Sequence, residues 1–328
     1  MKESDLLAHI YRRSAGLAAA FGHVVVGPGD DCAVVRTPGG DEILLTTDQL
    51  VEGRHYEPGT PIDLVARKAI ARSVSDIAAM GGTPTWSLAT ACLPRGYQHA
   101  DELFDAMHRW AKHWGCPLVG GDIAAFGDEG APVVLGVTVG GRMDASRIVE
   151  WFEQFDPVPP ERVSDLCRPV LRSGAKPGNR VFVTGTLGGS VRLGKHLTFE
   201  PRVAAGQWMA WTQSGVTAMI DLSDGLGRDA GRVAAASGVA FEFKATDIPL
   251  AERVESWAHA VRDGEDYELL FTADDDDQAG WHVGGNFVEG MHRIGHVRAL
   301  EPGEAPGVWV TDAYGQRHEV SQWGWDHE

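Results

Sequence analysis

Cysteines are scarce in this sequence, and none of them has a spacing typical of metal or redox sites. The four cysteines are Cys32, Cys92, Cys116 and Cys167, and no two of them form a C-x-x-C pair. This argues against a zinc site and against a disulfide framework. The sequence also lacks an H-E-x-x-H motif and a G-x-S-x-G motif, so it offers neither a metalloprotease helix nor a nucleophile elbow.

Long apolar runs are missing as well, and none is long enough to span a membrane. Arg12-Arg13 precedes a run from Ala15 to Phe21 that faintly resembles a twin-arginine signal, but this run has only seven apolar or small residues. We expect an amphipathic first helix there instead. With its few, unpaired cysteines, the chain is expected to be cytoplasmic.

Basic residues are outnumbered: 29 lysines and arginines stand against 46 acidic residues, which gives a net charge of -17. This balance argues against nucleic acid or an anionic membrane as a partner. An anionic substrate such as a nucleotide would therefore need metal ions to offset the repulsion. The 328 residues, 43% of them apolar, provide enough material for two domains with ordinary cores.

Acidic residues recur beside glycine turns and short apolar runs. Val24-Val25-Val26 predicts a strand that runs into the turn Gly27-Pro28-Gly29-Asp30-Asp31. Ile43-Leu44-Leu45 predicts another strand, which we expect to end in Thr46-Thr47-Asp48. Adjacent carboxylates repel one another, whereas Mg²⁺ binds carboxylate and hydroxyl oxygens and bridges them to phosphate. The pattern therefore favours a magnesium site.

Two later stretches repeat this pattern. Pro117-Leu118-Val119 runs into Gly120-Gly121-Asp122, and a strand through Ile220 is expected to end at Asp221. Ser223 or Asp224 is then predicted to cap the next helix, and capping alone would explain one of these residues but not Asp221. Asp76 belongs to a helix predicted from Asp63 to Met80, where an exposed ion pair with Arg72 is the simpler interpretation.

A second possible phosphate site is the stretch from Gly189 to His196, which nearly matches a P-loop. His196 stands where that motif needs a serine or threonine hydroxyl for Mg²⁺. The recurring aspartates instead favour a multi-metal site for a polyphosphate. Phosphoryl transfer depends mainly on positioning and charge neutralisation, so acids and Mg²⁺ suffice without a covalent intermediate.

Seven motifs in order carry a resemblance that spans about residues 24 to 272. They are GPGDDCAVV, LLTTDQLVEGRHY, ARSVSDIAAMGG, GGDIA, RSGAKPG, IDLSDGL and GEDYELLF. Together they are similar to the thiamine-monophosphate kinase family, within the aminoimidazole-ribonucleotide-synthetase-like superfamily. The resemblance implies Mg²⁺-assisted transfer of a phosphoryl group from ATP to thiamine monophosphate, which gives thiamine diphosphate.

The resemblance also implies a fold and an assembly. We expect an α/β (α+β) two-domain, synthetase-like fold in a homodimer. Residues 1–142 would form a mixed-sheet domain that binds metal and nucleotide and pairs into a dimeric barrel. Residues 171–328 would form a C-terminal α/β domain, with the nucleotide and several Mg²⁺ between the domains. Residues 143–170 are expected to be a linker or insertion without chemistry of its own.

Matching the motifs residue by residue implies a complete site. The implied metal ligands are Asp31, Thr46, Thr47, Asp48, Asp76, Asp122, Asp221 and Asp224. Among them, Asp48, Asp221 and Asp224 are expected to be catalytic. The implied nucleotide contacts are Gly121, Asp122, Arg172 and Ser223, and the implied contacts to thiamine phosphate are His55, Glu265 and Trp325, with Trp323 as an alternative to Trp325. The rival functions are another ATP-using member of the superfamily and a non-enzymic, acidic cation-binding protein.

Overall fold

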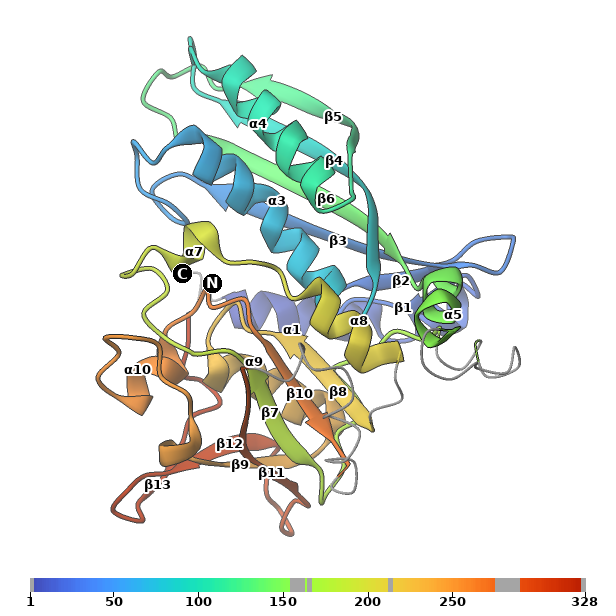
Figure 1. Cartoon of the computed structure of the whole chain (residues 1–328), viewed down its shortest axis with the longest axis vertical. Coiled ribbons are helices and arrows are strands. Elements are labelled where there is room, and N and C mark those ends of the chain that lie inside the picture. Colours follow the sequence, from blue (N-terminus) through green and yellow to red (C-terminus); the bar gives the residue numbers. More distant parts are fainter. Residues whose placement is uncertain (1–2, 154–162, 164–166, 212–214, 275–289, 326–328) are drawn as a thin grey trace.

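The computed structural model of the chain describes residues 3–153, 163, 167–211, 215–274 and 290–325. Two sheets, each with its own helices, are stacked one above the other (Figure 1). The first sheet has the strand order β1-β2-β3-β6-β4-β5, and the second has the order β13-β12-β9-β11-β7-β10-β8. The predicted mixed α/β fold is therefore confirmed.

The first sheet is built from the first half of the chain. Its strands are β1 (Val24–Val26), β2 (Ala33–Arg36), β3 (Glu42–Val51), β4 (Thr83–Leu93), β5 (Leu118–Ala125) and β6 (Val134–Arg142). β5 runs parallel to β4, and the other neighbours are antiparallel. The strands predicted in this region are all present.

Two sets of predicted site residues lie inside strands, whereas the sequence placed them at strand ends. β3 pairs with β6 from Ile43 to Val51, so Thr46, Thr47 and Asp48 continue the strand. Asp122 likewise lies inside β5, opposite Thr90 of β4. The sequence suggested that the strand ends in Thr46-Thr47-Asp48, whereas pairing with β6 extends it to Val51.

Helices α3 (Ile62–Ala79) and α4 (Ala100–His113) cover one face of the first sheet (Figure 1). The helix predicted from Asp63 to Met80 is present as α3, and it is buried on nearly all sides. It contacts β3 and β6 beneath it, α4 beside it, and α7, α8 and β8 from the second half of the chain. Polar side chains such as Lys68 and Ser75 are buried along with the apolar ones.

The second sheet follows from residue 180 onward. Its strands are β7 (Arg180–Thr184), β8 (Val216–Asp221), β9 (Ala240–Lys244), β10 (Leu269–Ala273), β11 (Met291–Arg298), β12 (Gly307–Thr311) and β13 (Arg317–Glu319). Helices α9 (Leu226–Ser237) and α10 (Trp257–Arg262) share its main core, and a short 3-10 turn, η1 (Ala245–Asp247), precedes α10.

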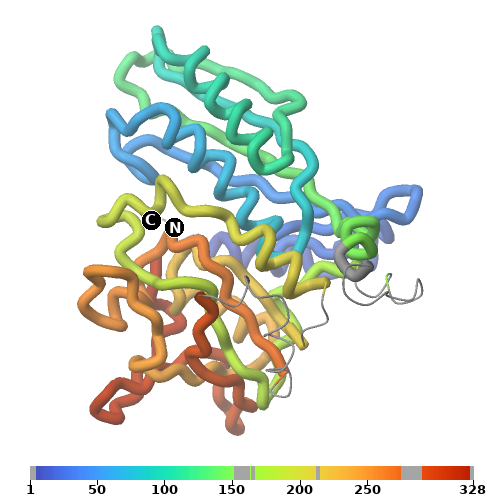
Figure 2. The backbone as a smooth tube through the Cα atoms, in the orientation of Figure 1, coloured from blue at the N-terminus to red at the C-terminus, as the bar shows by residue number. Residues whose placement is uncertain are grey.

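Helices α7 (Lys195–Thr198) and α8 (Val203–Trp211) run along the boundary between the two halves (Figure 2). Ala79 of α3, Trp208 of α8 and Met219 of β8 belong to one buried cluster, so the halves share a core. This packing fixes the position of α3 relative to the strand ends of the second sheet.

The remaining helices are α1 (Glu3–Ser14), α2 (Leu17–Ala20) and α5 (Ala145–Glu153). Part of the segment predicted as a linker, residues 154–162 and 164–166, lies outside the described residues. Its first part packs against the body, because Ile148 of α5 is buried in a cluster with Trp211 of α8. Across the residues that the structure describes, no helix is both long and apolar enough to cross a membrane.

Candidate active site

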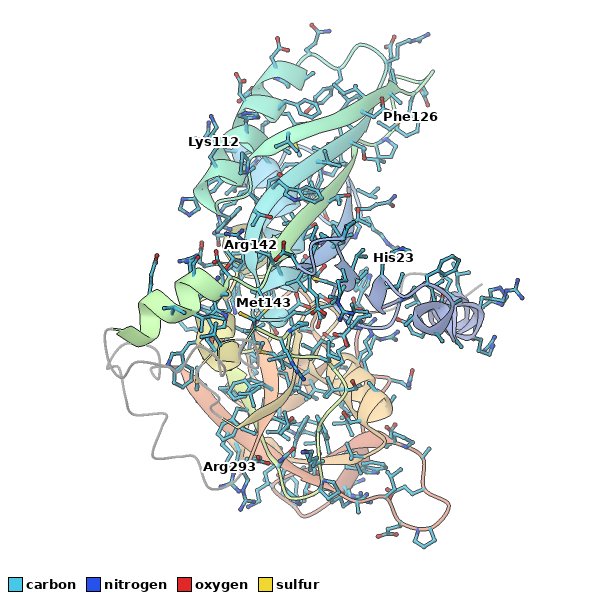
Figure 3. The ribbon with its side chains drawn as sticks, turned by 90° about the vertical axis from the view of Figure 1, so that its right-hand side faces the viewer. His23, Lys112, Phe126, Arg142, Met143 and Arg293 are labelled. Carbon is cyan, nitrogen blue, oxygen red and sulfur yellow. The ribbon has the colours of Figure 1, made fainter. Side chains whose placement is uncertain are left out.

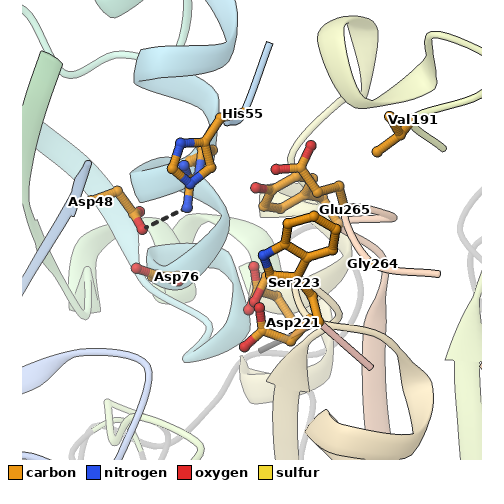
Figure 4. A pocket seen from close by; sticks show the side chains of 12 residues that line it. Asp48, His55, Asp76, Val191, Asp221, Ser223, Gly264 and Glu265 are labelled. Carbon is orange, nitrogen blue, oxygen red and sulfur yellow. Dashed lines mark ion pairs between the residues drawn. The ribbon is translucent and has the colours of Figure 1, made fainter. Parts of the chain in front are cut away.

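A pocket lies where α3 and β3 meet the strand ends and turns of the second half (Figure 4). It is lined by Asp48, His55, Arg72, Asp76, Val191, Asp221, Ser223, Asp224, Gly264, Glu265, Tyr267 and Trp325. Asp48, His55 and Asp76 face Glu265, Ser223 and Asp221 across it. Most of these residues were predicted from the sequence, and the fold brings them together from both halves of the chain.

Three carboxylates meet at the base of this region. One oxygen from each of Asp31, Asp76 and Asp221 lies within 4.8 Å of the other two. Asp31 comes from the turn between β1 and β2, Asp76 from the last turn of α3, and Asp221 from the end of β8. The Ser75 hydroxyl donates to Asp221 at 2.6 Å, and the Thr46 hydroxyl donates to Asp76. We call these three aspartates the acid cluster.

The acid cluster is electrostatically unfavourable without a cation. Burial raises the pKa of Asp76 well above its usual value, and the neighbouring charges of Asp48 and Asp221 raise it further. Burial likewise raises the pKa of Asp221, and the charge of Asp31 adds to this. A cation between these oxygens would remove the repulsion that raises the pKa values.

One carboxylate oxygen of Asp31 accepts a hydrogen bond, and the other has no hydrogen-bond partner among the described residues. Its Oδ1 accepts a hydrogen bond from Arg172 Nη2 at 2.6 Å, whereas its buried Oδ2 has no hydrogen-bond partner among the described residues. Buried polar atoms rarely stay unsatisfied, so this oxygen suits a metal ion. Arg172 was predicted as a nucleotide contact. In the structure it donates to Asp31 and does not line the pocket.

Arg72 and Asp76 do not form the exposed ion pair that the sequence made the simpler interpretation. The Arg72 guanidinium lies 3.5 Å from Asp48 and donates to the carbonyl oxygen of Gln49 at 2.6 Å. Asp48 also accepts a hydrogen bond from Ser73 at 3.1 Å. Asp76 is thereby left to the acid cluster, and Arg72 adds a positive charge to the pocket lining. Arg72 lies one helical turn before Asp76, and this spacing was the reason for expecting an ion pair between them.

The start of α9 differs from the capping prediction. The helix begins at Leu226, and the Asp229 carboxylate accepts hydrogen bonds from the N–H groups of Asp224 at 2.9 Å and Gly225 at 3.1 Å. Asp224 itself pairs with Arg232 at 2.5 Å. Neither Ser223 nor Asp224 caps the helix with its side chain, and both line the pocket.

His55, Glu265 and Trp325, the predicted contacts to thiamine monophosphate, all line the pocket. The Val51 N–H donates to His55 Nδ1 at 2.9 Å, so the neutral ring carries its proton on Nε2. Trp325 is half exposed, and its backbone N–H donates to the carbonyl oxygen of Asp224 at 2.8 Å. Trp323, the alternative in the sequence, stacks on Trp257 at 5.7 Å and does not line the pocket.

Comparisons with known proteins support the resemblance seen in the motifs. A family profile described as AIR synthase related protein, N-terminal domain, matches residues 29–143. The thiamine-monophosphate kinase of Rhodopirellula baltica is 34% identical over an alignment of 288 residues that covers 82% of this chain and 81% of that protein. The chain belongs to the thiamine-monophosphate kinase family.

Other members of the thiamine-monophosphate kinase family match over nearly the full length. The protein of Aquifex aeolicus is 31% identical over 327 residues, covering 91% of this chain and 92% of its own. A solved structure described as AaThiL complexed with AMPPCP and TMP superposes with a TM-score of 0.75 at 27% identity. It covers 100% of this chain and 97% of its own chain, so the similarity includes both sheets.

Two metal ligands implied by the kinase resemblance lie on the other face of the first sheet. Residues paired across neighbouring strands point to the same side, so Asp48 shares the helix-covered side with Val137. Thr47 pairs with Thr138 on the opposite, uncovered side, and the two hydroxyls lie 3.1 Å apart. Asp122, three strands from β3, is exposed on that side too. One chain therefore does not bring Thr47 or Asp122 to the acid cluster.

Gly121, the predicted nucleotide contact of the kinase motif GGD, has a packing role within the sheet. A Cβ atom at this position would lie 1.7 Å from the carbonyl oxygen of Ala89 in β4. Only glycine lets β5 approach β4 this closely. Like Asp122, Gly121 does not line the pocket.

The loop that resembled a P-loop uses its donors within the protein. The N–H of Gly188 donates to Asp266 at 2.9 Å, and the N–H of Gly189 donates to Asp263 at 2.8 Å. Lys195 donates to Glu268 at 3.0 Å and to the carbonyl oxygen of Thr186 at 3.1 Å. With carboxylates on these donors, the loop does not offer a phosphate site, and the pocket is the stronger candidate.

Proposed function

We propose that this chain catalyses transfer of the γ-phosphoryl group of ATP to thiamine monophosphate, with ADP and thiamine diphosphate as products. The single observation that carries the proposal is that one pocket is lined by Asp76 and Asp221 of the acid cluster and by His55, Glu265 and Trp325. Phosphoryl transfer needs a donor and an acceptor phosphate held together with their charge neutralised. Membership of the thiamine-monophosphate kinase family supports the same reaction, and ATP as co-substrate favours the cytoplasm.

The acid cluster suits Mg²⁺, because it offers hard oxygen donors and an unpartnered buried oxygen of Asp31. We assign Asp31, Asp76 and Asp221 as the main ligands of Mg²⁺, with Asp48 and Asp224 at the rim of the acid cluster. Bound Mg²⁺ would neutralise the phosphate charge. We place Ser223 beside the nucleotide phosphates. The Thr46 hydroxyl orients Asp76.

Four other lining residues, His55, Arg72, Glu265 and Trp325, suit thiamine monophosphate. His55 Nε2 can donate to its phosphate, and the guanidinium of Arg72 supplies a positive charge beside the same space. Thiamine carries a cationic ring, which is attracted by a carboxylate such as Glu265 and by the face of an indole such as Trp325. These contacts would orient the acceptor phosphate toward the acid cluster.

The substrate assignment predicts a clear preference. With ATP and Mg²⁺, thiamine monophosphate should yield thiamine diphosphate and one equivalent of ADP, whereas unphosphorylated thiamine should yield neither. Chromatographic separation of the thiamine compounds, with ADP measured in parallel, checks both products. Faster turnover of thiamine than of its monophosphate would contradict the assignment, and Mg²⁺ binding without any ADP release would favour the cation-binding alternative.

We also propose that the protein is a homodimer that buries the uncovered face of the first sheet. Figure 3 shows the strands of the first sheet, with Lys112 of α4 to one side of them. Leu88 on this face is 36% exposed, and its neighbours Trp86 and Thr90 are not buried either. Exposed apolar side chains at the centre of a sheet face favour association. The proposal assigns dimerisation to residues 1–142 and places Thr47, Gly121 and Asp122 near the partner chain, with residues 143–170 as an insertion.

A charge at the centre of this face should separate the subunits. We expect Leu88→Asp to be monomeric, because burying an unpaired carboxylate costs several kcal/mol. Leu6→Asp is the matched control, since Leu6 is a comparably exposed leucine, at 42%, on α1. Sedimentation equilibrium measures both masses. A wild-type monomer, or a dimer that tolerates Leu88→Asp, would refute the proposed interface.

A further inference from the structure

Lys68 is a buried lysine on α3 with two partners, both of them in the pocket region. Its side chain is completely buried, and its Nζ donates to the carbonyl oxygen of His55 at 2.6 Å and to the carboxylate of Glu265. Burial lowers its pKa to about 8, although the charge of Glu265 opposes this shift. A charge is rarely kept in such a place for stability alone, because its desolvation cancels most of the gain from pairing.

The two partners come from different halves of the chain. His55 follows β3 of the first sheet, and Glu265 lies in the turn before β10 of the second sheet. Both side chains line the pocket, whereas Lys68 does not. Lys68 therefore lies behind the pocket wall and connects two residues that face the substrate from opposite sides.

The Glu265 turn needs such a restraint. Its backbone adopts a positive φ of 66°, which is strained for a residue with a side chain. Its N–H donates to the carbonyl oxygen of Ser223 at 2.7 Å, which fixes the main chain. The ion pair with Lys68 fixes the carboxylate itself.

We propose that Lys68 is a positioning residue for thiamine monophosphate, which holds the His55 turn and the Glu265 carboxylate at a fixed separation across the two halves. The inference rests on the proposed function of His55 and Glu265 as contacts to this substrate. The acid cluster is held by other hydrogen bonds, which come from Arg172, Thr46 and Ser75. Loss of Lys68 should therefore disturb the acceptor side of the pocket and spare the nucleotide side.

The neighbouring Arg67 provides a matched control for a purely structural role. Its side chain is 8% exposed, and it donates to Glu200 at 3.0 Å and to the carbonyl oxygen of Leu197 at 3.3 Å. It therefore connects the same helix to the second half of the chain, but through residues that do not line the pocket. If Lys68 only joined the two halves, Arg67→Met and Lys68→Met should have similar kinetic effects.

The experiment measures KM for each substrate separately in wild type, Lys68→Met, Lys68→Gln and Arg67→Met, together with Tm. We expect Lys68→Met to raise KM for thiamine monophosphate about tenfold or more, because a hydrogen bond to a charged group is lost. KM for ATP should stay within about threefold, since only the acceptor contacts change. Arg67→Met should lower Tm but leave both KM values near those of wild type.

Each outcome separates the inference from the proposed function. A wild-type enzyme that does not phosphorylate thiamine monophosphate would overturn the proposed function. An active wild type with an unchanged KM for this substrate in Lys68→Met, or an equal rise in both KM values in Lys68→Met and Arg67→Met, would overturn the role of Lys68. If Lys68→Met does not fold, Lys68→Gln decides, because its shorter neutral amide cannot hold both partners and is expected to give the same selective rise.

Discussion

Asp221→Asn is expected to lower kcat for thiamine diphosphate formation by at least about a hundredfold, because one preorganised electrostatic group is worth roughly 2.7–4 kcal/mol of barrier. The substitution keeps the side-chain shape but removes one unit of negative charge and one anionic oxygen from the acid cluster. The Ser75 hydroxyl, now 2.6 Å from Asp221, can still donate to the amide oxygen. Steady-state kinetics with both substrates saturating provides the measurement.

The same variant should not lose stability, which separates a catalytic role from a structural one. The pKa of Asp221 is raised by burial and by the charge of Asp31, so its ionised form is disfavoured in the folded protein without a cation. Removing that charge should leave Tm unchanged or slightly higher in the absence of Mg²⁺. A variant that is inactive because it is unfolded would instead show a large drop in Tm.

Lys195→Met is the control for the alternative phosphate site. Lys195 pairs with the buried Glu268, which Arg202 also holds at 2.6 Å, so its loss should reduce stability modestly and leave turnover near that of wild type. The P-loop interpretation predicts the reverse. Loss of activity by orders of magnitude in Lys195→Met, combined with an active Asp221→Asn, would refute the acid cluster as the nucleotide site.

Removal of divalent cations should abolish turnover, and added Mg²⁺ should restore it. Without a cation, the carboxylates of the acid cluster and the phosphates of two substrates would repel one another across the pocket. Activity after treatment with EDTA, and after a titration with excess Mg²⁺, checks this expectation. An enzyme that retains its rate in EDTA would contradict the proposed role of the acid cluster.

Mg²⁺ should also stabilise the protein without substrates, and more strongly at higher pH. The pKa values of Asp76 and Asp221 are raised, so protons compete with the cation as the pH falls. The rise in Tm caused by Mg²⁺ should therefore be larger at pH 8 than at pH 6. Asp221→Asn should reduce this rise at both pH values, and an equal rise in wild type and variant would place the cation elsewhere.

The parts of the fold that were predictable from the sequence are those with a strong local pattern. Val24–Val26 is a short β-branched run before a glycine turn, and α4 repeats apolar residues at helical spacing. The full extent of β3 was not predictable, because Thr46 to Asp48 are polar and the strand continues beyond them to Val51 only through pairing with β6. The capping of α9 was missed because its acceptor, Asp229, lies inside the helix.

The sequence by itself determined the family and the residues able to do its chemistry, because ordered motifs and carboxylate side chains are properties of the linear chain. Only the tertiary structure decided which of them meet. It brought Asp31, Asp76 and Asp221 within 4.8 Å of one another and placed Asp122 on the opposite face of the first sheet. It also made Lys68 a buried link between His55 and Glu265. Contacts between distant segments depend on how the two sheets pack around α3, and local spacing does not encode that packing.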